Sequence, residues 1–278
     1  MTEQFPRPVA RPSQPSRRRF VQSLPLGGLL GAAFPAAAFA RIQPPVAGVG
    51  EWFPRQDPAL VQDVVGASHS DITRVRELVE RQPALARAAV DWGFGDWESA
   101  LGAASHTGRR EIAQLLLAHG ARPTLFSAAM LGQLAVVRAF VESSPGIQRT
   151  PGPHGIPLLN HAVAGGAGAE AVVTYLESVG GADVRPPTSP LTPAERDAVV
   201  GQYGYGPTAA DRFEVSVQND QLGLAHPGNS RRNLFHTGGL VFFPAGVPSV
   251  RIAFAREAGV VTQVTVADPD VMVTARRV

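Results

Sequence analysis

SALGAASHTG (residues 99–108) runs directly into RREIAQLLLAHGA (residues 109–121). The first segment consists mostly of small residues and ends at Gly108, and the second contains three consecutive leucines and ends on Gly120-Ala121. A glycine between two such segments commonly ends one helix before the next begins. The sequence therefore predicts a pair of short helices that meet at Gly108.

Three further segments share this order of small residues, a break and paired aliphatic residues. They lie at residues 64–79, where Ser70 replaces the glycine, at 123–141, around Gly132, and at 156–183, around Gly165. Gly132 and Gly165 are 33 residues apart, whereas Gly108 and Gly132 are 24 apart, so the connection after the second pair must be short. One helix pair buries too little apolar surface to be stable alone, and at least about three must stack. Residues 58–184 are therefore predicted to form an α-solenoid.

The repeated pattern resembles the ankyrin repeat, which opens with Thr-Pro-Leu-His, breaks at a glycine and closes on Gly-Ala. Residues 99–102 (SALG) stand where Thr-Pro-Leu-His belongs, so half of the opening signature is missing, while Leu115-Leu116-Leu117 and Gly120-Ala121 match the second half. The resemblance implies a concave surface that binds another protein. The alternative is an irregular helical domain whose glycines are ordinary helix stops.

The N-terminus has the order of an export signal. Residues 16–22 read SRRRFVQ, and the uncharged stretch 23–40 closes on Ala-Phe-Ala. A charged start, an apolar middle and an A-x-A close predict that residues 1–40 are a signal peptide, cleaved after Ala40. The order of Arg17, Arg18 and Phe20 resembles the twin-arginine motif, which a receptor reads as an address.

An exported protein, periplasmic or secreted, is therefore expected, with no stable membrane anchor after cleavage. The alternative is an uncleaved anchor, because the uncharged run of 20 residues at 21–40 is close to the shortest membrane span. Residues 41–57, which contain several prolines and lack periodicity, are predicted to be a flexible lead-in.

Removal of the signal reverses the sign of the net charge. The chain carries 25 basic and 23 acidic residues, and residues 1–40 hold five arginines and one acid, which leaves 20 basic and 22 acidic residues and a net charge of −2. A surface of this charge offers no net attraction to a phosphate backbone, so nucleic-acid binding is not expected.

Missing residue types narrow the chemistry further. The chain has no cysteine, which excludes disulfides, thiol nucleophiles and cysteine zinc sites, and no lysine, which excludes a Walker loop and a Ser-x-x-Lys site. The seven histidines are scattered. His106 and His119 are interpreted as helix caps, and His154 has no acid or base nearby in the sequence. We therefore predict no catalytic residue, no metal site and no cofactor, and hence a protein that is not an enzyme.

The C-terminal third changes to period-two alternation. After a proline-rich linker at 185–190, residues 191–278 contain short alternating segments separated by turn signals such as Asn219-Asp220. The predicted strands are 213–217, 221–224, 233–236, 240–243, 250–254, 260–266 and 271–275. They indicate a small antiparallel β-barrel or meander, so the whole chain is predicted to be an α+β multidomain protein.

Residues 191–278 resemble the small β domain that follows the catalytic domain of many exported serine β-lactamase-like proteins, and that follows ankyrin arrays in some bacterial proteins. The resemblance rests on the strand pattern, including 213–217 (FEVSV) and 250–254 (VRIAF). In those relatives the catalytic serine lies in the other domain, which is absent here.

The interior of this β domain could be filled or form a ligand cup. Phe213, Val215, Phe242 and Phe254 are predicted to face inward, and Tyr203 and Tyr205 are predicted to cover one end of the barrel. A filled core is expected, because a domain of this size has little apolar area to spare. A cup for a small apolar ligand is the alternative.

The segment DWGFGDW (91–97) connects the first two predicted helix pairs. Trp92, Phe94 and Trp97 are predicted to form a protein-binding hot spot, since tryptophan is enriched among residues that dominate interface energies. The alternative is that the rings fold back over the first repeat.

The sequence thus predicts an exported, non-enzymatic ankyrin-repeat protein that binds another protein. Binding of a small apolar ligand by the β domain is the second hypothesis, and a hydrolase with an unrecognised site is the third.

Overall fold

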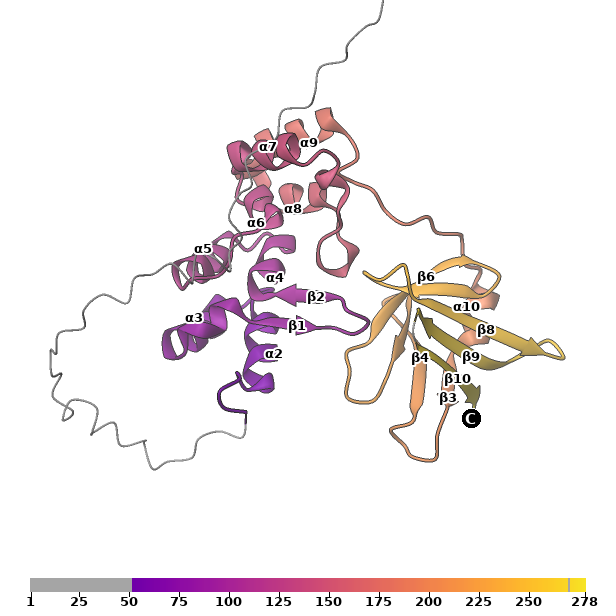
Figure 1. Cartoon of the computed structure of the whole chain (residues 1–278). Helices are drawn as coiled ribbons and strands as arrows, with labels where there is room; N and C mark the ends of the chain where they lie inside the picture. The colour runs from indigo at the N-terminus through magenta and orange to yellow at the C-terminus, as the bar shows by residue number, and fades with distance from the viewer. Residues whose placement is uncertain (1–51, 270) are drawn as a thin grey trace, which may run out of the picture. The chain divides into compact units, whose positions relative to one another are not determined.

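A computed structural model of the chain describes residues 52–269 and 271–278, and shows a helical region followed by an eight-stranded antiparallel β-barrel (Figure 1). The helical region and the barrel belong to one compact unit. The predicted order of a helical part and a small β part is therefore confirmed. The predicted signal peptide with Arg17, Arg18, Phe20 and the cleavage position after Ala40 lies outside the described residues, as do residues 41–51 of the predicted lead-in.

The helices of the repeat region come in four consecutive pairs at the predicted places. Their bounds are α2 Pro58–Ala67, α3 Ile72–Arg81, α4 Ala100–His106, α5 Arg110–Ala118, α6 Leu125–Met130, α7 Leu134–Ser143, α8 Leu158–Ala164 and α9 Glu170–Val179. The two helices of each pair contact each other, and the first helices of consecutive pairs, α2, α4, α6 and α8, also contact one another. The pairs therefore stack. Their buried apolar side chains form one cluster in the first two pairs, which Met130 of α6 joins, and a second cluster in the last two pairs.

Side-chain caps set the first residue of several of these helices. The carboxylate of Asp57 accepts a hydrogen bond from the amide of Ala59, and Pro58 occupies the first helical position of α2. Ser99 caps α4 through the amide of Gly102, and Thr124 forms a capping box with Ser127 at the start of α6. These caps satisfy amides that have no partner inside the helix.

Two of the predicted glycine breaks lie against the fourth helix pair. Gly108, in the second pair, faces the end of α8, and Gly132, in the third pair, faces the turn between α8 and α9. Gly108 and Gly132 have positive φ angles of 69° and 74°. A Cβ atom on Gly108 would lie 2.1 Å from the carbonyl oxygen of Ala164, and one on Gly132 would lie 1.8 Å from that of Gly168. Only glycine fits both the left-handed backbone and the contact.

A two-stranded hairpin separates the first and second helix pairs. Strands β1 (Ala89–Asp91) and β2 (Trp97–Ser99) are antiparallel, with Val90 opposite Glu98 and Asp91 opposite Trp97. Alternate side chains of a strand point to opposite faces. Glu98 is accordingly buried, whereas Trp97 is exposed.

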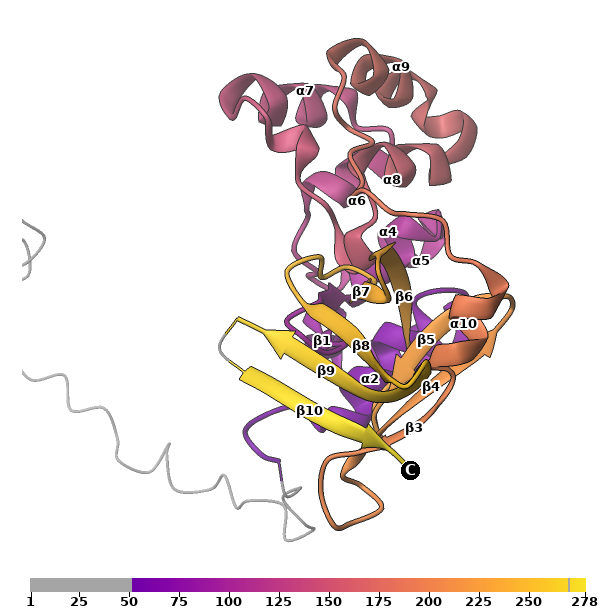
Figure 2. The same cartoon turned by 90° about the vertical axis from the view of Figure 1, so that its right-hand side faces the viewer.

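The barrel closes in the order β10-β3-β4-β5-β6-β7-β8-β9, with every neighbouring pair antiparallel. Its strands are β3 Gly201–Gly204, β4 Arg212–Gln218, β5 Gln221–Ala225, β6 Arg232–Gly238, β7 Val241–Pro244, β8 Arg251–Glu257, β9 Val260–Asp268 and β10 Val271–Arg277. Figure 2 shows β8, β9 and β10 running side by side. Of the two arrangements predicted, a barrel or a meander, the structure shows the closed barrel.

The β4–β5 turn is the predicted one. Asn219 and Asp220 have φ angles of 49° and 62°, as a tight hairpin turn with two left-handed residues requires. Helix α10 (Pro193–Val199) and strand β3 are absent from the predicted elements, because both are short and neither shows a full period of apolar residues.

Packed aromatic rings occupy the barrel interior. Phe213, Val215, Phe242 and Phe254 are buried, as predicted. The prediction that Tyr203 covers an end of the barrel is wrong, because it is fully buried, its ring centroid lies 5.6 Å from that of Phe254, and its hydroxyl donates to the carbonyl of Val199. A tyrosine can enter a core when its hydroxyl finds such a partner.

None of the helices in the described part of the chain is long and apolar enough to span a bilayer.

Candidate metal centre

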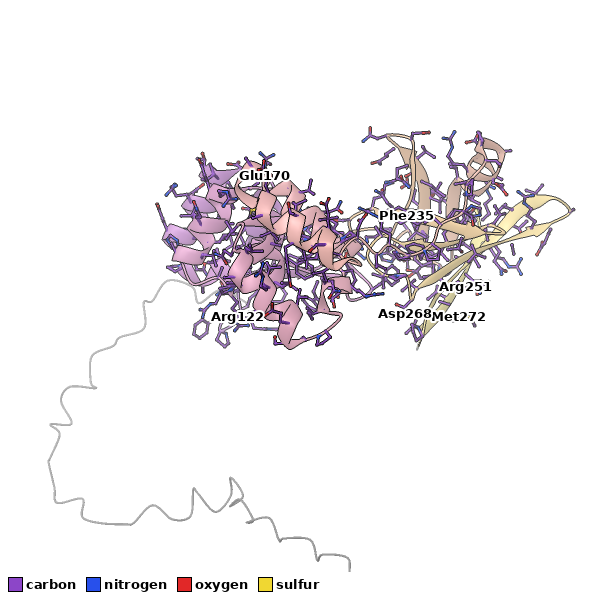
Figure 3. All side chains as sticks on the ribbon, turned by 90° about the horizontal axis from the view of Figure 1, so that it is seen from above. Arg122, Glu170, Phe235, Arg251, Asp268 and Met272 are labelled. Carbon is purple, nitrogen blue, oxygen red and sulfur yellow. The ribbon has the colours of Figure 1, made fainter. Side chains whose placement is uncertain are left out.

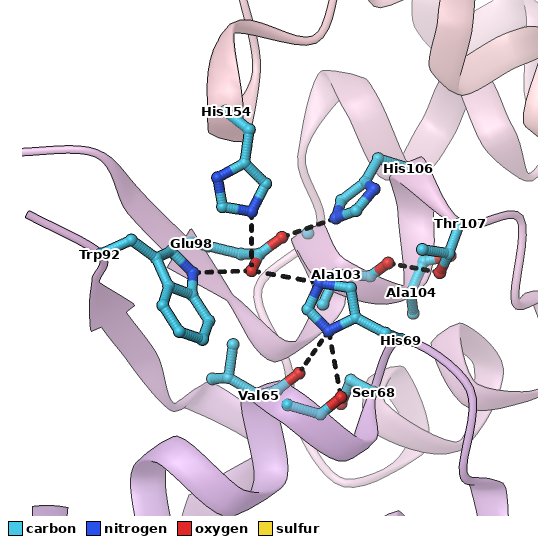
Figure 4. A network of polar contacts seen from close by, with 12 residues as sticks. Val65, Ser68, His69, Trp92, Glu98, Ala103, Ala104, His106, Thr107 and His154 are labelled. Carbon is cyan, nitrogen blue, oxygen red and sulfur yellow. Dashed lines mark hydrogen bonds and ion pairs between the residues drawn. The ribbon is translucent and has the colours of Figure 1, made fainter. Parts of the chain in front are cut away.

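Four side chains that could bind a metal ion meet inside the repeat region (Figure 4). They are His69, in the turn after α2, Glu98 on β2, His106 at the last residue of α4, and His154 in the short 3-10 turn Pro153–Gly155 that precedes α8. Each contributes one potential ligand atom, and these atoms all lie within 4.8 Å of one another.

The carboxylate of Glu98 is the centre of the group and is fully buried. Its Oε1 atom lies 2.8 Å from Nε2 of His106, and its Oε2 atom lies 3.3 Å from Nε2 of His154 and 3.5 Å from Nε2 of His69. The indole Nε1 of Trp92 donates to Oε2 at 2.8 Å. Three imidazoles therefore direct the same ring nitrogen at one carboxylate.

Hydrogen bonds on the far side of two rings fix their orientation. Nδ1 of His69 lies 3.2 Å from the carbonyl oxygen of Val65 and 3.0 Å from that of Gly66. Nδ1 of His154 donates to Oδ2 of Asp96 at 2.8 Å, and its backbone amide donates to Oδ1 at 2.9 Å. A ring that donates its Nδ1 proton presents Nε2 to a metal, which is the usual arrangement of histidine ligands.

The pKa values of the group reflect these contacts. Burial alone would raise the pKa of Glu98, but hydrogen bonds from His106 and His154 and the charges of His154 and His69 lower it to about 2. Burial alone would lower the pKa of His154, but its hydrogen bonds to Asp96 and Glu98 raise it to about 9. Without a metal, the buried carboxylates are thus neutralised by a protonated imidazole and by Arg232, whose Nη2 is 2.5 Å from Asp96 Oδ2.

Three imidazole nitrogens and one carboxylate oxygen suit zinc and similar first-row transition ions. A tetrahedral ion with bonds of about 2.0–2.2 Å separates its ligand atoms by roughly 3.3–3.6 Å. The distances from Glu98 to the three Nε2 atoms run from 2.8 to 3.5 Å. Small adjustments of the side chains would therefore make room for an ion, which would replace the direct contacts between the rings and the carboxylate.

The structure brings together histidines that are far apart in the sequence. The interpretation of His106 as a helix cap is wrong, because its Nε2 atom binds Glu98 and not a helix carbonyl. The same interpretation of His119 is confirmed, since its Nδ1 atom contacts the carbonyl of Leu115 at 2.9 Å. His154 has two acids beside it, Asp96 and Glu98, although none is near it in the sequence.

The predicted aromatic hot spot is not one surface. Trp92 is partly buried against the core of the first two helix pairs and donates to Glu98. Phe94 is partly buried against the barrel core, whereas 63% of the surface of Trp97 is exposed. Two of the three rings are therefore engaged by the chain itself.

A surface cavity of about 470 Å³ lies elsewhere, at the edge of the barrel where β8, β9 and β10 meet. Its lining includes Arg251, Asp268 and Met272, which Figure 3 shows grouped on this side of the barrel. A charged pair in the lining does not suit an apolar ligand.

No family model matches the sequence, and no curated protein matches it. Among solved structures, a crystal structure of SurE is similar to part of the chain, with 20% sequence identity and a TM-score of 0.25. The similarity covers 42% of this chain and 28% of the SurE chain. A TM-score of this size establishes no common fold.

Proposed function

We propose that this protein binds one divalent transition-metal ion of the zinc class through His69, Glu98, His106 and His154. The observation that carries the proposal is the convergence of three Nε2 atoms on one fully buried carboxylate. A buried carboxylate is costly unless it is paired, and a metal ion satisfies it together with all three rings.

The centre fits a structural role. Four protein ligands complete a tetrahedral site and leave no position for substrate, as in structural zinc sites. The ligands come from the first helix pair, the hairpin, the second pair and the turn before the fourth pair. One ion would therefore connect parts of the stack that are distant in the sequence, and the protein need not be an enzyme.

The test is a titration of the chelator-treated full-length protein with zinc. We expect one ion to bind per chain in isothermal titration calorimetry. Because the ion binds the folded state, the free energy of unfolding should rise by about 2.7 kcal/mol when free zinc is 100 times its dissociation constant. Thermal unfolding at several zinc concentrations measures this. A melting temperature that does not change with zinc, and no saturable heat, would contradict the proposal.

We also propose that the helix pairs are ankyrin-type repeats that present a binding surface. The support is the number of stacked pairs, the hairpin between the first two pairs, and the glycine-dependent approach at Gly108 and Gly132. The order of Arg17, Arg18 and Phe20 supports export of the protein.

One observation favours protein binding as a second function. Trp97 is more exposed than any other tryptophan among the described residues, and it is the first residue of β2, next to the hairpin turn. If it is an interface anchor, Trp97→Ala should weaken partner binding by about 2 kcal/mol. The measurement is recovery of co-purifying protein from the exported fraction, with Trp52→Ala as the control, because Trp52 is also exposed but lies outside the repeats. Equal recovery from the wild type and both variants would reject Trp97 as an anchor.

The second hypothesis for the barrel, an apolar ligand inside it, receives less support. The rings of Tyr203, Phe242 and Phe254 pack against one another, with centroids 5.6 and 5.7 Å apart. These contacts take up interior space that a ligand would need.

A further inference from the structure

The carboxylate of Asp96 connects the proposed metal centre to the barrel. Oδ2 of Asp96 accepts a hydrogen bond from Nδ1 of His154 at 2.8 Å and contacts Nη2 of Arg232 at 2.5 Å. Asp96 belongs to the hairpin turn, whereas Arg232 is the first residue of barrel strand β6. Contacts therefore run without a break from Glu98 through His154 and Asp96 to a barrel side chain.

The contact between Asp96 and Arg232 is buried. Only 4% of the side chain of Asp96 and 8% of that of Arg232 are exposed. Arg232 also donates to the carbonyl of Ala245, in the loop after β7. At such burial, a carboxylate without its guanidinium partner loses a large favourable interaction and cannot be fully compensated by water.

The barrel loop also contacts the backbone of the ligand-bearing turn. A Cβ atom placed on Gly246 would lie 2.9 Å from Cα of His154 and 3.0 Å from Cγ of Asp96. A Cβ atom on Gly155 would lie 3.1 Å from Cα of Gly246. The position of His154 therefore depends on how the barrel docks.

From this geometry we infer that Arg232 is a positioning residue of the metal centre, and that metal binding and docking of the barrel on the hairpin are coupled. The inference rests on the proposed function. Arg232 holds Asp96, Asp96 holds the ring and the backbone amide of His154, and His154 presents Nε2 to the ion. Removal of a residue that orients a ligating histidine in this way typically weakens metal binding by about 10–100-fold.

Coupling must act in both directions, because it is a difference in binding free energy between two states. If the docked barrel favours metal binding, bound metal must favour the docked barrel to the same degree. Zinc should therefore slow amide hydrogen exchange in β6 and β7, although neither strand contributes a ligand.

The experiment compares Arg232→Gln with Arg231→Gln in the full-length protein. Arg231 is the matched control, because it precedes Arg232 in the chain but its side chain binds Ser216, Gln221 and Asn233 within the barrel. Zinc affinity is measured by competition with a chromogenic chelator, and hydrogen exchange is measured with and without zinc. A Co²⁺ absorption spectrum reports the ligand geometry.

We expect Arg232→Gln to bind zinc 10–100-fold more weakly than the wild type, to lose the zinc-dependent protection of β6 and β7, and to change the Co²⁺ spectrum. Arg231→Gln should stay within about 3-fold of the wild type, and Arg232→Lys, which keeps the charge, should recover part of the affinity. A loss of stability alone would not change the Co²⁺ spectrum of the molecules that remain folded.

Equal affinities of the wild type and Arg232→Gln would overturn the coupling and leave the metal site intact. A wild type that binds no zinc would overturn the proposed function itself, so the two failures are distinguishable. If Arg232→Gln does not fold, as judged by circular dichroism, the comparison of Arg232→Lys with Arg231→Lys decides. Weaker zinc binding by Arg232→Lys than by Arg231→Lys supports the coupling, and equal binding overturns it.

Discussion

The double variant His69→Ala/His106→Ala is expected to lose stoichiometric zinc binding. Each substitution removes one of the Nε2 atoms that face Glu98, and Glu98 and His154 alone supply only two ligands. Two ligands cannot complete a tetrahedral site. The zinc affinity should therefore fall by far more than the roughly 10–100-fold lost when a residue that only orients a ligand is removed. Metal content by atomic emission after dialysis against micromolar zinc is the measurement.

The matched control for this variant removes two histidines that lie outside the group. His119→Ala/His226→Ala deletes the same number of imidazoles, but His119 binds the carbonyl of Leu115 and His226 binds the hydroxyl of Tyr205. This control should retain one zinc ion per chain. If both double variants keep the ion, the metal lies elsewhere. If both lose it, the binding by the wild type depends on the fold and not on these ligands.

The helices and strands could be predicted from local sequence patterns, because each pattern reflects a physical requirement of residues that are close in the sequence. A glycine between apolar segments marks a helix end, and Gly108 and Gly132 do adopt the left-handed backbone that only glycine accepts easily. Alternation along 213–217 marks a strand with one buried face, and Phe213 and Val215 are buried. Strand β3 has only four residues, too few to show a period.

The proposed metal centre could not be predicted in the same way, because stacking of the repeats brings its residues together. His69 and His106 lie near corresponding positions, each at the end of the first helix of its pair or just after it, so stacking of the first two pairs places their ring centroids 5.1 Å apart. That correspondence was present in the sequence. The contribution of His154 was not, because it depends on a turn after the third pair folding back toward the hairpin.

The inward position of Glu98 also had a local signal. It lies between Trp97 and Ser99 in a strand, so its side chain must leave the face that Trp97 occupies. A charged residue on the core side of a hairpin is unusual, and it needs partners of opposite charge or a metal. The acidic residue most buried in the described chain is thus also the one that gathers three histidines.

Stability of the stack should depend strongly on the close approach at Gly132. Gly132→Ala combines two costs. A side chain at φ 74° costs about 1–2 kcal/mol, and its Cβ atom would lie 1.8 Å from the carbonyl oxygen of Gly168, which forces the third and fourth helix pairs apart. Displacing packed backbone of this kind typically costs a further 1–3 kcal/mol or more.

Gly120→Ala has the backbone cost alone and is therefore the matched control. Gly120 has a similar φ angle of 87°, but a Cβ atom added there would meet no atom within 4 Å. Urea unfolding followed by circular dichroism should show a loss of about 1–2 kcal/mol for Gly120→Ala and about 2–5 kcal/mol for Gly132→Ala. The difference measures the contact with Gly168 itself, since the backbone strain is common to both. Equal losses would mean that the fourth pair does not pack against the third as closely as these distances require, and stabilisation would then not pass from one repeat to the next at this position.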